Sequence, residues 1–376
     1  MGSSAGGSGP LSGGNDIVQF GRLRRRRAGL GSLLLAVVVA IAVLAVVRHA
    51  GGNPHRSPPP AVAVTDVGHP ILGVRASWEL FGLDGSGVVA VQFRRGQITR
   101  TTLPPLLSDG PLFFVAADGE AIIRPLDNVP GYVVPDGKPA RRLTGLLAQG
   151  GILLPGPTLT EQWFGGTALG LLGPGGKQVN AHLAAVARAW APSWVIADGA
   201  GGVVLVDMRS QVEEYDARPG MLRPVGAQLV AVGPTTWLGM NCESGPCQDV
   251  VISAATGASR TLPGPASYAN PWPWQALPGV TSPDGAAAAV IVADHFGGQA
   301  RLDLINLSTG GVVRVPVPVA RDSSGQSLAW SPDSRWLFVV TAHGTLAIVD
   351  GRTGLPQHLN LGLSGLSQIV MRPAGG

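Results

Sequence analysis

The sequence predicts an all-β protein in which a single transmembrane α-helix precedes a ring of small, repeated sheets. Glycine and proline are abundant, with 55 and 32 copies spread over the 376 residues, and both build the tight turns that join short strands. Few stretches keep the apolar period of about 3.6 residues that indicates an amphipathic helix. A mainly helical fold is therefore not expected.

One segment near the N-terminus is predicted to cross the membrane. Residues 28–47 (AGLGSLLLAVVVAIAVLAVV) carry no charge, and a helix of this length, at about 1.5 Å per residue, spans about 30 Å, the thickness of the hydrocarbon core. Cytoplasmic flanks of such helices are rich in Arg and Lys. We therefore expect a single-pass protein of the cell membrane with a cytoplasmic N-terminus and an extracytoplasmic C-terminal part. The arginines that indicate this topology are Arg24, Arg25, Arg26 and Arg27.

Two other interpretations of this segment exist. A buried core helix would not follow a cluster of arginines and a Gly/Ser-rich tail. A cleaved signal peptide usually has an apolar region of about 7–15 residues, which is shorter than this one. No cysteine follows the segment before Cys242, so a lipoprotein anchor is excluded. An uncleaved anchor is favoured, and a cleaved signal peptide stays as the alternative.

The flanking segments complete the expected organisation. Residues 1–27 form a disordered cytoplasmic tail that ends in the arginine cluster, and residues 48–61 form a Pro-rich linker. Residues 62–374 form the extracytoplasmic domain. From Ala61 onward there are twenty basic and twenty-two acidic residues, a near balance that predicts no nucleic-acid partner. The lipid bilayer is an expected partner of the N-terminal part.

A weak repeat decides the expected architecture. Seven times a glycine follows an extended segment and precedes a short strand that ends in Leu or Val. The glycines are Gly96, Gly137, Gly176, Gly220, Gly257, Gly310 and Gly354, at spacings of 41, 39, 44, 37, 53 and 44 residues. A period near about 40 residues is typical of propeller blades. We expect a seven-bladed β-propeller, with six or eight blades left open because residues 179–191 could form a short helix.

The chain ends are expected to close this ring. The first unit lacks an opening strand, and a spare strand stands at residues 367–374. Pairing the two would leave no unpaired inner edge. The last unit is the clearest, with strands expected at 326–331, 335–341, 345–349 and 356–361. Its Trp336 segment matches the Trp78 segment of the first unit over three strands.

Short motifs give this repeat a family resemblance. Ser282-Pro283-Asp284-Gly285 and Ser331-Pro332-Asp333 each follow an expected inner strand, and the last unit ends in an Asp-x-x-Thr-Gly turn. In these features residues 76–374 resemble the TolB-like and WD-repeat-like (YVTN-type) β-propeller families. The motifs are specific only in the last two units. The resemblance implies a fold and no particular ligand or activity.

The only two cysteines, Cys242 and Cys247, flank a turn between two expected strands. Residues across a short loop can bring their Cβ atoms within the roughly 4 Å that a disulfide needs. A metal site would lack its other ligands, and redox pairs favour two intervening residues. A structural disulfide, formed in an oxidising compartment, is expected.

No catalytic constellation is evident. The expected inner strands contain no ionisable group before their ends, and turn chemistry accounts for the aspartates of the Asp-Gly turns, which are Asp84, Asp118, Asp136 and Asp284. No histidines stand at metal-ligand spacing, so neither a cofactor nor a metal is expected. An enzyme is not the favoured interpretation. The alternative is a hydrolase or lyase with a site built from upper-face loops by Asp249, Asp294, His295 or Glu243.

The best candidate binding site is the insertion at residues 264–279 (GPASYANPWPWQALPG), which lengthens one repeat to 53 residues. Tyr268, Trp272 and Trp274 could form an aromatic platform for an envelope protein or saccharide. The alternative is that the two indoles fold back over a blade interface. The overall expectation is a binding or scaffolding module of the cell envelope. A ligand sensor that signals through the short tail is the second alternative.

Overall fold

The computed structural model separates into two units, Met1–Ser57 and Pro58–Gly376. The residues it describes lie between 62 and 372. The gaps within this range are 105–111, 119, 126–128, 146–151, 166–168, 174–176, 181–193, 208–212, 219–220, 243–245, 265, 267–278, 294–299, 320–325 and 358. The expected tail, membrane helix and linker at residues 1–61 lie outside the described residues. Within the described part, no helix is long and apolar enough to cross a membrane.

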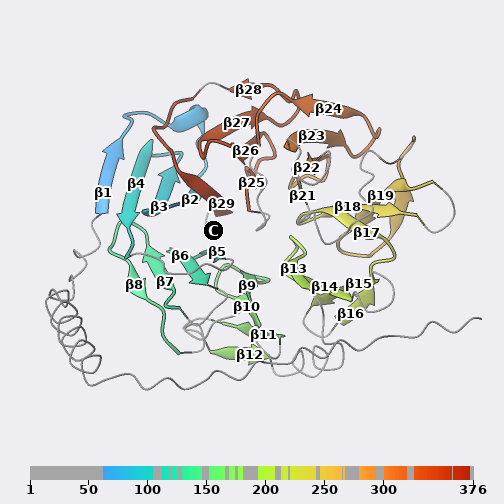
Figure 1. The fold of residues 1–376 in the computed structure, drawn as a ribbon, viewed down its shortest axis with the longest axis horizontal. Coiled ribbons are helices and arrows are strands. Elements are labelled where there is room, and N and C mark those ends of the chain that lie inside the picture. The colour runs from blue at the N-terminus through green and yellow to red at the C-terminus, as the bar shows by residue number, and fades with distance from the viewer. Residues whose placement is uncertain are drawn as a thin grey trace, which may run out of the picture. The chain divides into compact units, whose positions relative to one another are not determined.

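The second unit is built from antiparallel meanders of consecutive strands arranged around a common centre (Figure 1). Four sheets have four strands each. They are β5 (Leu112–Ala117), β6 (Glu120–Pro125), β7 (Tyr132–Pro135) and β8 (Arg141–Arg142); β9 (Ile152–Pro155), β10 (Gln162–Gly165), β11 (Leu169–Leu172) and β12 (Gln178–Asn180); β13 (Trp194–Ala197), β14 (Val203–Asp207), β15 (Glu213–Arg218) and β16 (Met221–Pro224); and β25 (Leu328–Trp330), β26 (Trp336–Val340), β27 (Leu346–Asp350) and β28 (Pro356–Gln357).

An eight-stranded sheet combines two further meanders of the same kind. They meet through a parallel pairing of their first strands, β17 and β21, over only two residue pairs. The first meander is β17 (Gln228–Val232), β18 (Thr236–Asn241), β19 (Gln248–Ser253) and β20 (Ser259–Thr261). The second is β21 (Gly279–Thr281), β22 (Ala287–Ala293), β23 (Ala300–Asn306) and β24 (Val312–Val315).

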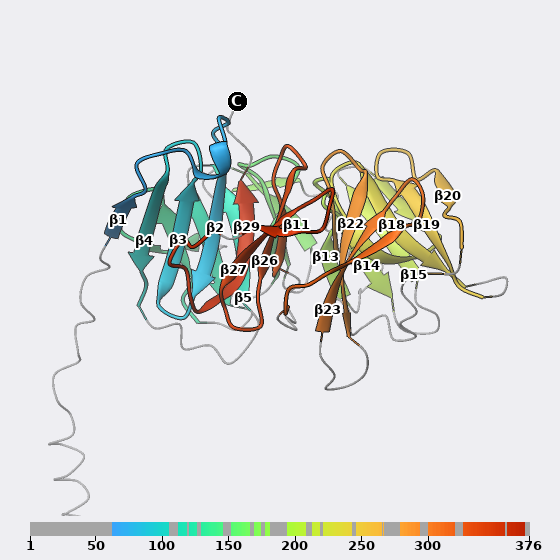
Figure 2. The same cartoon turned by 90° about the horizontal axis from the view of Figure 1, so that it is seen from above.

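The remaining sheet joins the two ends of the domain, as the sequence predicts. Its strand order is β1 (Val62–Asp66), β4 (Gln97–Thr102), β3 (Gly87–Gln92), β2 (Glu79–Asp84) and β29 (Leu366–Arg372). The C-terminal β29 pairs antiparallel with β2, so that Glu79 lies opposite Arg372 and Gly82 opposite Ile369. Figure 2 shows β2, β29 and β3 side by side. Radially arranged meanders closed in this way form a β-propeller.

The sheet order also corrects two sequence expectations. β1 adds a fifth, outermost strand to the closing sheet, which the repeat did not predict. The helix considered at residues 179–191 is wrong at its start, because Val179 and Asn180 belong to β12 and pair with β11. Residues 181–191 lie outside the described residues. A short helical period in the sequence is weak evidence for a helix when the same segment can pair with a neighbouring strand.

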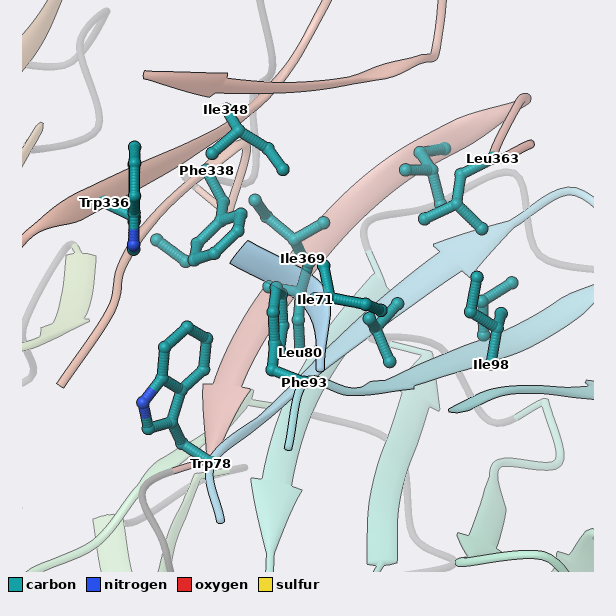
Figure 3. Packing of buried hydrophobic residues seen from close by; sticks show 14 of the residues in the cluster. Ile71, Trp78, Leu80, Phe93, Ile98, Trp336, Phe338, Ile348, Leu363 and Ile369 are labelled. Carbon is teal, nitrogen blue, oxygen red and sulfur yellow. The ribbon is translucent and has the colours of Figure 1, made fainter. Parts of the chain in front are cut away.

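Some strands of this domain are buried along their whole length because sheets pack against both of their faces. All six residues of β2 and all five of β26 are buried, a pattern that strands covered on both faces share. A cluster of such residues joins the closing sheet to the β25–β28 sheet (Figure 3). In it the rings of Trp78 and Phe93 have centroids 4.3 Å apart, and those of Phe93 and Phe338 are 5.2 Å apart.

Tryptophan indoles connect neighbouring sheets by hydrogen bonds to backbone carbonyls. Trp237 Nε1 donates to the carbonyl of Asp198 (2.8 Å), and Trp330 Nε1 donates to that of Val280 (3.1 Å). Trp163 does the same with Gly201 (2.9 Å). Each indole is thus buried with its polar atom satisfied. Four strand tryptophans are all buried, namely Trp78, Trp237, Trp330 and Trp336.

The repeated glycine turns are confirmed where they are described. Gly96, Gly137, Gly257, Gly310 and Gly354 all have positive φ, the conformation that glycine adopts without steric cost. At Gly96 a Cβ would lie 2.0 Å from the carbonyl oxygen of His69, so a larger residue would displace the segment between β1 and β2. Gly176 and Gly220 lie outside the described residues.

The Ser-Pro-Asp motifs adopt the same hydrogen-bonded turn twice. Ser282 Oγ donates to Asp284 and accepts from the backbone N–H of Ala287. Ser331 Oγ donates to Asp333 and accepts from the backbone N–H of Trp336. These turns follow the first strands β21 and β25, so the motif resemblance reflects one local structure used in both sheets.

The Asp-x-x-Thr-Gly turn after β27 is held by its aspartate. Burial alone would raise the pKa of Asp350, but hydrogen bonds from Thr353 and Arg352 outweigh it and lower the pKa below its ordinary value. The backbone N–H groups of Thr353 and Arg352 donate to Oδ1 at 2.9 and 3.1 Å. The aspartate is therefore a turn residue, as the sequence indicates.

A truncation tests the closing strand. A chain ending at Gly365 lacks β29, which would expose the inner edge of β2 and part of the cluster in Figure 3. We expect the loss of a cooperative thermal unfolding transition, measured by circular dichroism. A chain ending at Arg372 retains β29 and should melt as the full chain does. Equal melting of both truncations would contradict the assignment of β29 as the closing strand.

Candidate functional site

The predicted disulfide is present. Cys242 and Cys247 are joined across the hairpin that links β18 to β19. The side chain of Cys242 is exposed, and that of Cys247 is partly buried and packs on the apolar cluster around Leu238 and Met240. The hairpin is therefore attached to the core on one side and open to solvent on the other.

The disulfide hairpin also holds the start of the predicted binding loop. The backbone N–H of Ala266 donates to the carbonyl of Cys247 (3.1 Å), and that of Leu262 donates to the carbonyl of Asp249 (2.8 Å). Ala266 packs on the same apolar cluster as Cys247. The chain that leads into residues 264–279 is thus fixed against the hairpin. Tyr268, Trp272 and Trp274 themselves lie outside the described residues, as do Arg24, Arg25, Arg26 and Arg27.

Of the four residues of the alternative hydrolase or lyase site, the described part of the chain contains one, Asp249. Asp249 lies on β19 opposite Met240 and is 2% exposed. Glu243, Asp294 and His295 lie outside the described residues. No group of three or more His, Cys, Asp or Glu side chains suited to a metal ion occurs in the part of the chain that the structure describes.

A cluster of three charged side chains was missed by the sequence reasoning. Arg372, at the end of β29, forms ion pairs with Glu79 at the start of β2 and with Asp136 in the turn between β7 and β8. The Arg372–Asp136 distance is 2.8 Å. We call Glu79, Asp136 and Arg372 the seam cluster, because it lies where the two chain ends meet.

The seam cluster corrects the expectation that turn chemistry alone explains the aspartates. Asp136 stands in an Asp-Gly turn but also binds Arg372 from a different sheet. Asp84 caps its own turn through the N–H groups of Ser86 and Gly87 and in addition pairs with Arg100. One available signal was overlooked: pairing the first and last strands in register places Glu79 opposite Arg372.

The seam cluster is sheltered from solvent, which shapes its electrostatics. The side chains of Glu79 and Arg372 are 11% and 13% exposed, and the guanidinium of Arg372 lies 5.6 Å from the ring centroid of Phe81. Burial raises the pKa of Glu79, the carboxylate of Asp136 raises it further, and Arg372 opposes both.

Polar side chains elsewhere in the interior connect sheets. Gln368 on β29 donates to the carbonyl of Leu112 (3.1 Å), and Gln326 donates to that of Phe114 (2.6 Å), both on β5. Arg124 on β6 is 3% exposed and donates to the carbonyl of Ile152 on β9. Burial lowers the pKa of Arg124. Of these three side chains only Gln368 stands on an innermost strand, β29, because Arg124 lies on the second strand of its sheet and Gln326 precedes β25.

Comparison with known proteins gives similarity of structure only. No family model and no curated protein matches the sequence. TolB from Acinetobacter baumannii shares 13% identity over 79% of this chain and 83% of that chain, with a TM-score of 0.41. A putative 6-phosphogluconolactonase from Bacteroides uniformis shares 12% over 80% and 100%, with a TM-score of 0.48.

A third solved structure has a comparable likeness. AztD from Citrobacter koseri shares 13% identity over 75% of this chain and 81% of that chain, with a TM-score of 0.43. Because all three TM-scores lie below 0.5, the propeller assignment depends on the strand pairing described above. The different names of these proteins likewise give no activity to this chain.

Removal of the disulfide should destabilise the domain. Closing a loop of this length stabilises a fold by about 2 kcal/mol on the chain-entropy account. We expect the double variant Cys242→Ala/Cys247→Ala to lose about that much free energy of unfolding in denaturant titrations. The wild-type chain with reductant is the matched comparison and should shift by a similar amount. An unchanged unfolding midpoint in both would show that the hairpin is held without the disulfide.

Proposed function

We propose that this protein is a single-pass membrane protein whose extracytoplasmic, seven-bladed β-propeller is a binding or scaffolding module of the cell envelope. The observation that carries the proposal is the contact between Ala266 and Cys247. It fixes the start of the longest predicted insertion, residues 264–279, on a disulfide-closed hairpin. Loops placed on a rigid scaffold are the usual sites of recognition.

The strand order supports a count of seven blades. Each meander of four consecutive strands is taken as one blade, and the eight-stranded sheet counts as two because only two residue pairs join its halves. The closing sheet supplies the seventh, with β29 as its innermost strand and β1 as an extra outer strand. The seven glycine turns of the sequence then fall one to each blade.

The disulfide supports an extracytoplasmic location. Disulfides persist in oxidising compartments and are rare in the cytosol, and Cys242–Cys247 is formed in this structure. This agrees with the topology that the arginine cluster and the apolar segment at residues 28–47 predict. The membrane anchor stays a proposal based on sequence.

The composition of the insertion suggests the chemistry of its partner. Tyr268, Trp272 and Trp274 stand within seven residues among Pro and Ala, with no charged side chain in 264–279. Aromatic side chains with polar tips are suited to stacking on sugar rings or packing against peptide side chains. A saccharide or protein of the envelope is therefore the proposed partner, with contact made mainly by apolar and hydrogen-bonding groups.

Alanine substitution tests the binding loop. We expect Trp272→Ala/Trp274→Ala to reduce recovery of envelope partners at least tenfold when the full chain is purified from detergent-solubilised membranes, since an interface tryptophan commonly contributes about 2 kcal/mol or more. Leu355→Ala, which removes a 60% exposed apolar side chain from a turn of another sheet, is the matched control. Equal recovery with both variants would place the partner elsewhere.

Reporter fusions test the topology. A reporter that is active only outside the cytosol should be active when fused after Gly376 and inactive when fused before Arg24, because the arginines hold their end of the segment in the cytoplasm. Replacing Arg24, Arg25, Arg26 and Arg27 by Glu should weaken this asymmetry. A C-terminal reporter active only in the cytosol would contradict the proposed location.

A further inference from the structure

The seam cluster is largely buried and has more acidic than basic side chains. Glu79 and Asp136 each carry a carboxylate and Arg372 one guanidinium, so the cluster has a net charge of −1 when both acids are ionised. The exposed fractions of the Glu79, Arg372 and Asp136 side chains are 11%, 13% and 25%. A buried carboxylate without a full counter-charge is costly.

One atom of the cluster lacks a donor. Asp136 Oδ2 accepts from Arg372, whereas Asp136 Oδ1 is sealed from solvent and has no hydrogen-bond partner among the described residues. Glu79 Oε2 accepts from the same guanidinium nitrogen. The two carboxyl groups therefore lie side by side on one guanidinium nitrogen. Two ionised carboxylates have no hydrogen with which to bond to each other.

We propose that the seam cluster is a proton-binding site, in which Glu79 carries a proton, donates it to Asp136 Oδ1, and thereby strengthens closure of the propeller. The proton comes from solvent and sits on the Glu79 oxygen that does not face Arg372. With it in place the cluster is neutral: Arg372 pairs with the Asp136 carboxylate, and the buried Oδ1 has a donor.

Two exposed arginines in the adjacent turn bind other side chains. Arg94 and Arg95, in the neighbouring turn between β3 and β4, are exposed and hydrogen-bond to Ser77 and Gln92. The residue opposite Glu79 on β3 is Gln92, which is uncharged. The charged groups that act on Glu79 are Asp136 from the β7–β8 turn and Arg372 from β29.

The direction of the pKa shift agrees with this geometry. Burial and the Asp136 carboxylate raise the pKa of Glu79 above its ordinary value. A carboxyl group whose pKa is raised on folding stabilises the fold fully below its unfolded pKa, and this contribution is lost as the pH rises through the folded pKa. The closed domain should therefore be more stable against unfolding at mildly acidic pH than at neutral pH.

The consequence falls on the closing strand because Arg372 is the last residue of β29. Glu79 lies directly opposite it on β2, and Asp136 comes from the adjacent sheet. The three side chains thus connect the first strand of the meander, the C-terminal strand and the next blade. A change of protonation here alters the contact that holds the C-terminal strand in place.

Thermal unfolding of the full chain in detergent micelles tests the proposal at about pH 5.5 and about pH 7.5. Glu79→Gln keeps the shape of the side chain and mimics its neutral form. Lowering the pH should raise the Tm of the wild-type chain by about 2 °C more than it raises the Tm of this variant. Asp136→Asn, which removes the second negative charge, should abolish the same gain.

Glu120→Gln is the matched control. It removes a carboxylate that pairs with Arg141, whose side chain is 66% exposed, in the same sheet as Asp136, and its Tm should follow the wild type at both pH values. If the difference in Tm between wild type and Glu79→Gln is the same at both pH values, the proposal is wrong. That result is expected if a water molecule, and not Glu79, donates to Asp136 Oδ1. If either variant fails to fold, infrared titration of the wild type decides: if no protonated carboxyl band grows in as the pH is lowered from about 7.5 to about 5.5, the site is refuted.

Discussion

The pairing of β29 with β2 is the interaction on which the rest of this domain depends. It joins residues that are nearly three hundred positions apart in sequence, Glu79 and Arg372, and ordering so long a loop costs conformational entropy. Backbone hydrogen bonds alone offset little of that cost. The burial of Trp78, Phe93 and Phe338 between the closing sheet and the last sheet provides the apolar contribution.

Closure of the ring also determines the hydrogen-bond partners of buried polar side chains. A ring of sheets packed side by side leaves few places for a buried donor or acceptor to meet water. Indole nitrogens, the amides of Gln326 and Gln368 and the guanidinium of Arg124 therefore bond to carbonyls of neighbouring sheets. Buried without a partner these polar atoms would destabilise the fold, and the carbonyls of neighbouring sheets provide the partners.

The two candidate regions of the molecule differ in how they are supported. The disulfide hairpin is attached to the core through Cys247 and carries the start of the insertion at 264–279, which suits a surface that contacts another molecule. The seam cluster is sheltered and lies between chain ends, which suits a role in holding the ring together. The proposed roles in recognition and in closure thus concern separate parts of one domain.

The sequence by itself determined the all-β class, the glycine turns, the disulfide and the joining of the two chain ends. These features follow from local chemistry or from repetition: positive φ at Gly96 or Gly354 requires glycine, and a missing first strand has one obvious substitute. Tertiary structure decided between the strand and the helix that the sequence allowed at Val179, and it alone decided that β1 adds to an outer edge and that Asp136 meets Arg372. Each of these outcomes depends on which segments of the folded chain meet, and only the Asp136–Arg372 pair joins two sheets. Local patterns carry no information about which side chains face one another across a packed interface.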